Sequence, residues 1–264
     1  MKITIFTGDQ RRHFSLINKM ATIAEEVHAV IEVPLDKITT SITHLDNSNI
    51  LSEYFQQVSE AESKVFGQDS EVLQHVKKTI IKTGLINSIA PNEIELALKS
   101  DIFVVFGSSY IKGWLAEFLI RNRAINIHMG LSPFYRGAAC NFWALYDLRP
   151  QFVGATIHLL NNGLDSGDII CHAVPQLVGV DSFEFSMRSV KVAHDALTRL
   201  ITNNEIASIL PIKQDKSQQI RYSRVSDFSP VVASKFLQRG HTMHDFQEMA
   251  LGSFEPHLVN PFFE

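Results

Sequence analysis

The sequence predicts an α/β fold built around a parallel β-sheet. Strand patterns alternate with helical patterns along most of the 264 residues, and this alternation is typical of parallel sheets with helices on their faces. Residues 102–106 are continuously apolar, as expected of a strand buried on both sides. Polar side chains gather just after several of these strands, at the edge of the sheet where ligands bind in such folds.

The first elements are indicated by apolar runs and turn residues. A strand is expected at residues 2–6, because this apolar run ends in the turn Thr7-Gly8-Asp9. A helix at 13–24 and a second strand at 27–33 follow. Together they predict the start of an alternating strand and helix order.

Three helices are expected in the next part of the chain. Between residues 50 and 66 apolar side chains recur near helical spacing, and Gly67 ends the run. Another helix is expected at 72–81. A third is expected at 91–98, where Pro91 suits the first turn of a helix.

The remainder of the chain continues the alternation and then changes character after Pro211. Strands are expected at 102–106, 124–128, 153–159, 169–174 and 220–222, and helices at 114–120, 183–202, 231–238 and 243–251. A further helix is expected beyond Ala139, where it carries Phe142, Trp143 and Leu145. The prediction is a domain at 1–210 followed by a small C-terminal lobe at 211–264.

Composition excludes several classes of protein. A net charge of −4 gives no basic field for a nucleic acid. The two cysteines, Cys140 and Cys171, form no disulfide framework and fit a reducing compartment. Residues 1–6 lack a signal-peptide pattern, and no apolar run approaches the roughly 20 residues that span a bilayer. We therefore expect a cytoplasmic protein without a nucleic acid, membrane or metal partner.

The most specific chemical signal is a pair of polar residues at a strand end. Asn126 and His128 lie two residues apart in an apolar run, so both point to the same face of a strand. Asp165 follows in the downstream turn Leu-Asp-Ser-Gly-Asp. An imidazole that moves protons, an amide that stabilises an oxyanion and a carboxylate that orients the imidazole suit acyl transfer. The alternative is satisfied polar groups at a strand end.

The order of motifs between residues 103 and 175 resembles the formyltransferase family that uses 10-formyltetrahydrofolate. That order is Asn-x-His, Ser-Pro-x-Tyr-Arg-Gly, an aromatic helix, Gly-x-Thr-Ile-His and Leu-Asp-Ser-Gly-Asp. The resemblance implies a Rossmann-like sheet of the formyltransferase type and 10-formyltetrahydrofolate as co-substrate. It also places the catalytic roles on Asn126, His128 and Asp165.

The same resemblance implies where the folate binds. One wall is the strand end Phe106, Gly107, Ser108, Tyr110 and Ile111, where an apolar slot suits a flat pterin and glycine permits close approach. The opposite wall is residues 160–165, with Leu160 and Leu164. The alternative for the first wall is a plain buried strand and turn.

The loop after His128 reads Met-Gly-Leu-Ser-Pro, and this version is similar to nucleotide-sugar N-formyltransferases of lipopolysaccharide pathways. The expected acceptor is therefore the amine of a nucleotide-linked amino sugar used in surface polysaccharide synthesis. Guanidinium groups grip phosphates well, although solvated arginines are an equal alternative here. The candidate acceptor residues are Arg11, Arg12, Ser132, Tyr135 and Arg136.

Other functions remain open at this stage. One is formylation of initiator methionyl-tRNA, and another is hydrolysis of the folate with water as the acceptor. A third is a silent folate-binding module. A homodimer is also left open.

Overall fold

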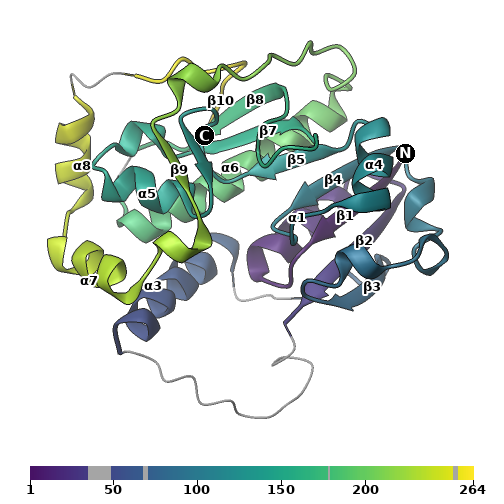
Figure 1. Cartoon of the computed structure of the whole chain (residues 1–264), viewed down its shortest axis with the longest axis horizontal. Helices are drawn as coiled ribbons and strands as arrows, with labels where there is room; N and C mark the ends of the chain where they lie inside the picture. The colour runs from purple at the N-terminus through teal and green to yellow at the C-terminus, as the bar shows by residue number, and fades with distance from the viewer. Residues whose placement is uncertain (35–48, 68–70, 178, 252–254) are drawn as a thin grey trace.

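The computed structural model describes residues 1–34, 49–67, 71–177, 179–251 and 255–264. Within them an eight-stranded sheet in the order β10-β8-β7-β5-β4-β1-β2-β3 crosses the molecule (Figure 1). Its strands are β1 (Lys2–Thr7), β2 (Glu26–Val33), β3 (Lys77–Lys82), β4 (Ile102–Phe106), β5 (Ile125–His128), β7 (Ala155–Leu159), β8 (Ile169–Val174) and β10 (Phe262–Phe263). A second, two-stranded sheet pairs β6 (Tyr135–Gly137) with β9 (Arg221–Ser223).

The expected α/β fold is confirmed, with one reversal in strand direction. Strands β1 to β5 run parallel to one another, whereas β7 is antiparallel to both β5 and β8. Residues 160–168 join β7 directly to β8, and such a short connection is possible only between antiparallel strands. The reversal pairs His128 at the end of β5 with Thr156 at the start of β7, and the loop that follows β7 begins beside the start of β5.

The helices agree closely with expectation for most of the chain. Asp181 caps the longest of them, because its carboxylate accepts the backbone N–H groups of Phe183 and Glu184. The helices are α1 (Arg11–Ala21), α3 (Asn49–Phe66), α4 (Gly113–Arg121), α5 (Cys140–Tyr146), α6 (Ser182–Thr202), α7 (Pro230–Arg239) and α8 (Met243–Ala250).

Two expected helices were wrong. The region 72–81 contains β3, whose β-branched Thr79, Ile80 and Ile81 suit a strand and which pairs in parallel with β2. The region 91–98 forms only short 3₁₀ turns at Pro91–Glu93 and Ala97–Lys99. In both regions the preferences of the residues for strand or turn conformations outweigh the helix-like spacing of their apolar side chains.

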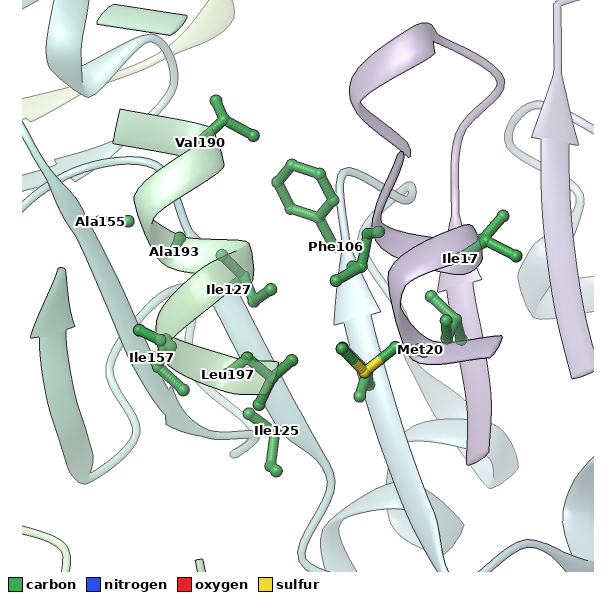
Figure 2. Close-up of a cluster of buried hydrophobic side chains, with 14 of the residues drawn as sticks. Ile17, Met20, Phe106, Ile125, Ile127, Ala155, Ile157, Val190, Ala193 and Leu197 are labelled. Atoms are coloured by element: carbon green, nitrogen blue, oxygen red, sulfur yellow. The ribbon is translucent and has the colours of Figure 1, made fainter. Parts of the chain in front are cut away.

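One face of the sheet is covered by α1 and α6. Figure 2 shows Ala193 and Leu197 of α6 beside Ile127 of β5 and Ile157 of β7, all within one buried cluster. On the other face, a second cluster joins the sheet to α4 through Phe6, Phe103, Val105, Leu115 and Leu119. Burial on both faces fixes the sheet edge from which the site residues project.

The C-terminal residues pack onto the rest of the chain. Strand β9 pairs with β6, and β10 adds to the main sheet beside β8. The division into 1–210 and 211–264 remains a prediction. Among the described residues, none of the helices combines the length and apolar character needed to cross a membrane.

The difference in burial between Ile157 and Ile80 predicts that their replacement by alanine will have very different effects on the free energy of unfolding. Ile157 is 0% exposed, whereas Ile80 on the edge strand β3 is 64% exposed. We expect Ile157→Ala to lower the free energy of unfolding by about 2–5 kcal/mol through lost burial and a residual cavity. Ile80→Ala should change it by less than about 1 kcal/mol. Urea unfolding of both variants checks this, and equal losses would contradict the assignment of the core.

Candidate functional site

The predicted catalytic residues come together at the carboxyl end of β5. Nδ1 of His128 lies 3.3 Å from Oδ1 of Asp165, and both side chains are nearly buried. Nδ2 of Asn126 lies 3.5 Å from the same carboxylate oxygen. Asp165 has a φ of +46° in the turn after β7, a region that aspartate tolerates better than most residues. The structure therefore assembles all three residues from two distant segments.

The His128 and Asp165 side chains form a buried ion pair. Burial alone lowers the pKa of His128, but the charge and hydrogen bond of Asp165, together with those of Cys140, outweigh it and raise the pKa well above 6.5. Burial raises the pKa of Asp165, but the charge of His128 outweighs it, so that pKa lies below 3.8. Both shifts favour an imidazolium beside a carboxylate over a neutral imidazole.

A second histidine, which the sequence reasoning did not select, orients Asn126. Nδ2 of Asn126 lies 2.9 Å from Nε2 of His158, and Nδ1 of His158 lies 2.8 Å from the carbonyl oxygen of Leu159. Because Nδ1 faces a carbonyl it carries the proton, and Nε2 accepts from the Asn126 amide. Burial lowers the pKa of His158 to about 4, which keeps the ring neutral in that role.

The sequence did contain a signal for this residue. His158 ends the Gly-x-Thr-Ile-His segment, and it is the register partner of Asn126 across the antiparallel pair of β5 and β7. A parallel sheet, as expected from the sequence, would not have predicted that pairing.

The seven expected folate residues line one cavity with the catalytic residues. This donor cavity has a volume of about 590 Å³. The hydroxyl of Tyr110 donates to the carbonyl oxygen of Asn162 at 3.0 Å, which joins the two walls. The predicted lining residues are Phe106, Gly107, Ser108, Tyr110, Ile111, Leu160 and Leu164.

The structure gives a different reason for glycine at position 107. Gly107 has a φ of +65°, and a Cβ there would overlap Nε2 of His13. The ring of His13 packs edge-on against Phe106 at 5.1 Å. Glycine is thus required by the packing of His13, whether or not a pterin approaches it.

A second cavity lies on the other side of His128. This aromatic cavity has a volume of about 340 Å³ and is lined mainly by apolar side chains. It shares Arg12, His128, Met129 and Gly137 with the donor cavity. Its aromatic lining residues are Tyr54 and Phe55 of α3, Phe142 of α5, Phe183 of α6 and Phe236 of α7. Because they come from four helices, no local pattern in the sequence indicated them.

Of the expected acceptor residues, Arg12 lines both cavities. Arg11 lines neither, and its Nη1 lies 3.5 Å from the carbonyl oxygen of Gly67. Ser132 is fully buried and its carbonyl oxygen lies 2.8 Å from Nε2 of His172. The buried Tyr135 donates its hydroxyl to Asp147 at 3.2 Å. These contacts favour packing roles for Ser132 and Tyr135.

Arg136 anchors the loop that carries Asp165. Its Nη2 donates to the carbonyl oxygen of Leu164 at 2.7 Å, and its Nη1 lies 3.3 Å from Oε1 of Gln219. Gln214 supports the same loop by donating to the carbonyl oxygens of Asp165 and Gly167 at 3.0 and 2.8 Å. The guanidinium of Arg136 is thus directed at the chain itself, which favours a structural role over a grip on a diphosphate.

A metal site is not indicated by these contacts. Within the ranges that the structure describes, no group of three or more His, Cys, Asp or Glu side chains is arranged to hold a metal ion.

Solved structures share this fold over nearly the whole chain. A sugar N-formyltransferase from Shewanella sp. FDAARGOS_354 is 18% identical with a TM-score of 0.51, covering 100% of this chain and 92% of that one. The formyltransferase PseJ from Anoxybacillus kamchatkensis, in complex with UDP-4,6-dideoxy-4-formamido-L-AltNAc and tetrahydrofolate, is also 18% identical with a TM-score of 0.51. Those alignments cover 95% of this chain and 100% of PseJ. At this identity the likeness shows the fold.

Curated relatives match a shorter part of the chain. The methionyl-tRNA formyltransferase of Anaeromyxobacter dehalogenans strain 2CP-C is 33% identical over 123 residues, which are 46% of this chain and 39% of that protein. The enzyme of the same name from Lachnospira eligens is 35% identical over 103 residues, 37% of this chain and 31% of that protein. The matched part thus spans well under half the length of these relatives. The model of the formyl transferase family matches residues 1–201, and the chain therefore belongs to this family.

Proposed function

We propose that this chain transfers the formyl group of 10-formyltetrahydrofolate to the primary amine of a nucleotide-linked amino sugar. The observation that carries the proposal is that two cavities of different character meet at the His128–Asp165 ion pair. A transfer reaction between two substrates needs this arrangement, because donor and acceptor must reach one catalytic group from different sides.

The donor cavity suits a folate. Phe106, Ile111 and Leu160 supply apolar walls, while backbone groups around Gly107 and Ser108 offer polar partners to a flat heterocycle. Tetrahydrofolate is present in the PseJ complex, which has the same fold. These points support 10-formyltetrahydrofolate as the co-substrate.

The charge state of the site assigns the proton steps. As the amine nitrogen bonds to the formyl carbon, the formyl oxygen becomes negative, and the His128 imidazolium and an Asn126 N–H stabilise it. When the bond from the formyl carbon to the folate nitrogen breaks, His128 donates a proton to that nitrogen. The ring then recovers the proton that the attacking amine loses. Asp165 keeps the ring oriented throughout and stabilises its charged form before the proton is donated and after it is recovered.

His158 determines which amide hydrogen of Asn126 can donate a hydrogen bond to the oxyanion. One amide hydrogen is held by Nε2 of His158 at a donor–acceptor distance of 2.9 Å, whereas the other faces Asp165 at the longer distance of 3.5 Å. The second hydrogen is therefore the one free to move to an oxyanion. His158 is a positioning residue that acts through Asn126.

The aromatic cavity suits the sugar of the acceptor. Pyranose rings have apolar C–H faces that pack on aromatic side chains, and Phe142 and Met129 line this cavity together with His128. The net charge of −4 does not suit a tRNA, whose binding needs many phosphate contacts. Both points favour a small acceptor, for use in surface polysaccharide synthesis.

A panel of acceptors tests the proposal directly. Turnover is measured with 10-formyltetrahydrofolate and nucleotide-linked 3-amino and 4-amino sugars, with charged initiator tRNA, and without any acceptor. We expect formylation of at least one sugar and none of the tRNA. Formylation of the tRNA alone would overturn the proposed acceptor, and formate release that needs no acceptor would indicate a hydrolase. Absence of all three would indicate a silent folate-binding module.

The catalytic residues predict large losses of rate. His128→Ala and Asp165→Asn should each lower kcat by about two to four orders of magnitude, because both act on the proton steps. Asn126→Ala should lose about two to three orders through the oxyanion. Folate binding, measured by calorimetry, should stay within about threefold of the parent. Near-native turnover of the His128 variant would disprove the mechanism.

The positioning role of His158 can be separated from its contribution to folding. We expect His158→Ala to lower kcat about tenfold or more with little change in KM, because Asn126 loses its fixed orientation. His172→Ala is the matched control: His172 is also buried on a neighbouring strand, and burial lowers its pKa to about 4 as well. Equal losses of kcat in the two variants at equal stability would argue against a specific role.

The ion pair predicts a defined dependence on pH. Because the pKa of His128 is raised, the stability it contributes is complete below about pH 6.5 and is lost as pH rises through the folded-state value. Because the pKa of Asp165 is lowered, its contribution is present above about pH 3.8 and is lost as pH falls through the folded-state value. Activity should therefore hold a plateau between the two values.

NMR titration of the His128 ring tests this assignment. In the parent protein the ring should titrate above pH 6.5. In Asp165→Asn, burial is no longer opposed by the carboxylate and only Cys140 still raises the value, so the pKa of His128 should fall. His158 provides an internal reference, because its ring should stay neutral down to about pH 4 in the parent. An unchanged His128 titration in the variant would contradict the ion pair.

The donor cavity can be tested by filling it. Reduced folates, including the unreactive 5-formyl isomer, should raise the Tm of the parent by mass action, and NAD(P) should not. Leu164→Trp should reduce that shift, because Leu164 lines the cavity and is 41% exposed. Leu210→Trp, at a position that is 86% exposed, is the control. An undiminished folate shift in Leu164→Trp would place the folate elsewhere.

A further inference from the structure

The turn between β1 and α1 occupies a place where α/β folds commonly bind phosphate. The turn residues Gly8 and Asp9 line the donor cavity, and α1 begins at Arg11 directly beside it. A helix N-terminus attracts anions through its unpaired N–H groups and its dipole. The first turn of α1 contains no acidic residue and includes two arginines. By its sequence this turn is suited to an anion.

The chain fills this position with its own carboxylate. Oε1 of Glu62, on α3, accepts the backbone N–H of Arg12 at 3.0 Å and its guanidinium Nη1 at 3.0 Å. Glu62 is only 7% exposed. A phosphate oxygen at a helix N-terminus makes this same pair of contacts, one to the main chain and one to a cationic side chain.

The neighbouring donors of the first turn are also engaged. Nδ1 of His13 accepts the backbone N–H of Gln10 at 3.1 Å. The N–H groups of His13 and Phe14 donate to the carbonyl oxygen of Gln10 at 2.9 and 3.1 Å. An incoming phosphate would therefore have to displace Glu62 to obtain the contacts that this site can offer.

We propose that Glu62 is a specificity-determining residue that excludes phosphate from the N-terminus of α1. An acceptor held by a phosphate monoester at this turn is thereby rejected, because its phosphate would meet a fixed negative charge. An amino sugar whose phosphates lie away from the reacting amine is not affected. This proposal concerns the same site as the proposed function, and it rests on the proposed function for the identity of the acceptor.

The position of Glu62 on α3 links this exclusion to the second cavity. The same helix carries Tyr54 and Phe55, which line the aromatic cavity, and Arg12 lines both cavities. One helix thus supplies apolar walls for the acceptor and removes the anion site next to it. The two features together favour an uncharged group beside the reacting amine.

Phosphate binding to charge-neutral variants tests the exclusion. Calorimetry with inorganic phosphate is run on the parent, Glu62→Gln and Glu62→Ala, with potassium chloride at matched ionic strength as the reference. Both variants should bind phosphate at least about tenfold more tightly than the parent, because Arg12 loses its partner. Adding Arg12→Ala to Glu62→Ala should abolish the gain. Glu62→Gln keeps the shape of the side chain and reports the outcome if the alanine variant does not fold.

A second ion pair of similar burial serves as the control. Arg188 and Glu184 on α6 lie 3.0 Å apart, with side-chain exposures of 27% and 19%, against 24% and 10% for Arg12 and Glu62. Glu184→Ala should not create phosphate binding. Equal phosphate affinity in the parent and in a folded Glu62 variant would overturn the proposal. This measurement needs no formyl transfer, so a failure of the proposed function would not affect it.

Discussion

The geometry of the site depends on keeping one ion pair charged while it is nearly buried. Removing an imidazolium and a carboxylate from water is costly, and their attraction offsets that cost only when the remaining polar atoms are satisfied. His128 and Asp165 meet this condition because Asn126 approaches the same carboxylate and Nε2 of His128 lies 3.4 Å from the carbonyl oxygen of Tyr135. The surrounding residues serve mainly to hold this pair in place.

The loop that carries Asp165 is held from the C-terminal part of the chain. Gln214 bonds two of its carbonyl oxygens, and Gln219 contacts Arg136, which bonds a third. Pairing of β9 with β6 brings these residues to the site. Residues beyond 210 therefore contribute to the geometry of the candidate site by holding a loop of the preceding segment.

The sequence predicted the parts of the site that are local in the chain. Asn126 and His128 lie on one short strand, and the two proposed folate walls are continuous segments of the chain, so strand spacing and motif order were sufficient to predict that these residues lie together. His158 and Glu62 were missed because their roles depend on pairing between strands or helices far apart in sequence. The partner of Asn126 is set by the antiparallel register, and the partner of Arg12 lies 50 residues away on α3.

The arginines show why residue type alone does not identify a ligand. Arg12 and Arg136 are both near the site, and by charge alone each suits a phosphate. In the folded chain Glu62 neutralises Arg12. Arg136 instead donates to the backbone carbonyl oxygen of Leu164 and to the side-chain amide oxygen of Gln219. The pKa of His128 is raised by Asp165 and Cys140, which the fold brings against it. A cationic side chain at the candidate site is thus favoured by folding, whereas the arginines contribute chiefly to the framework around it.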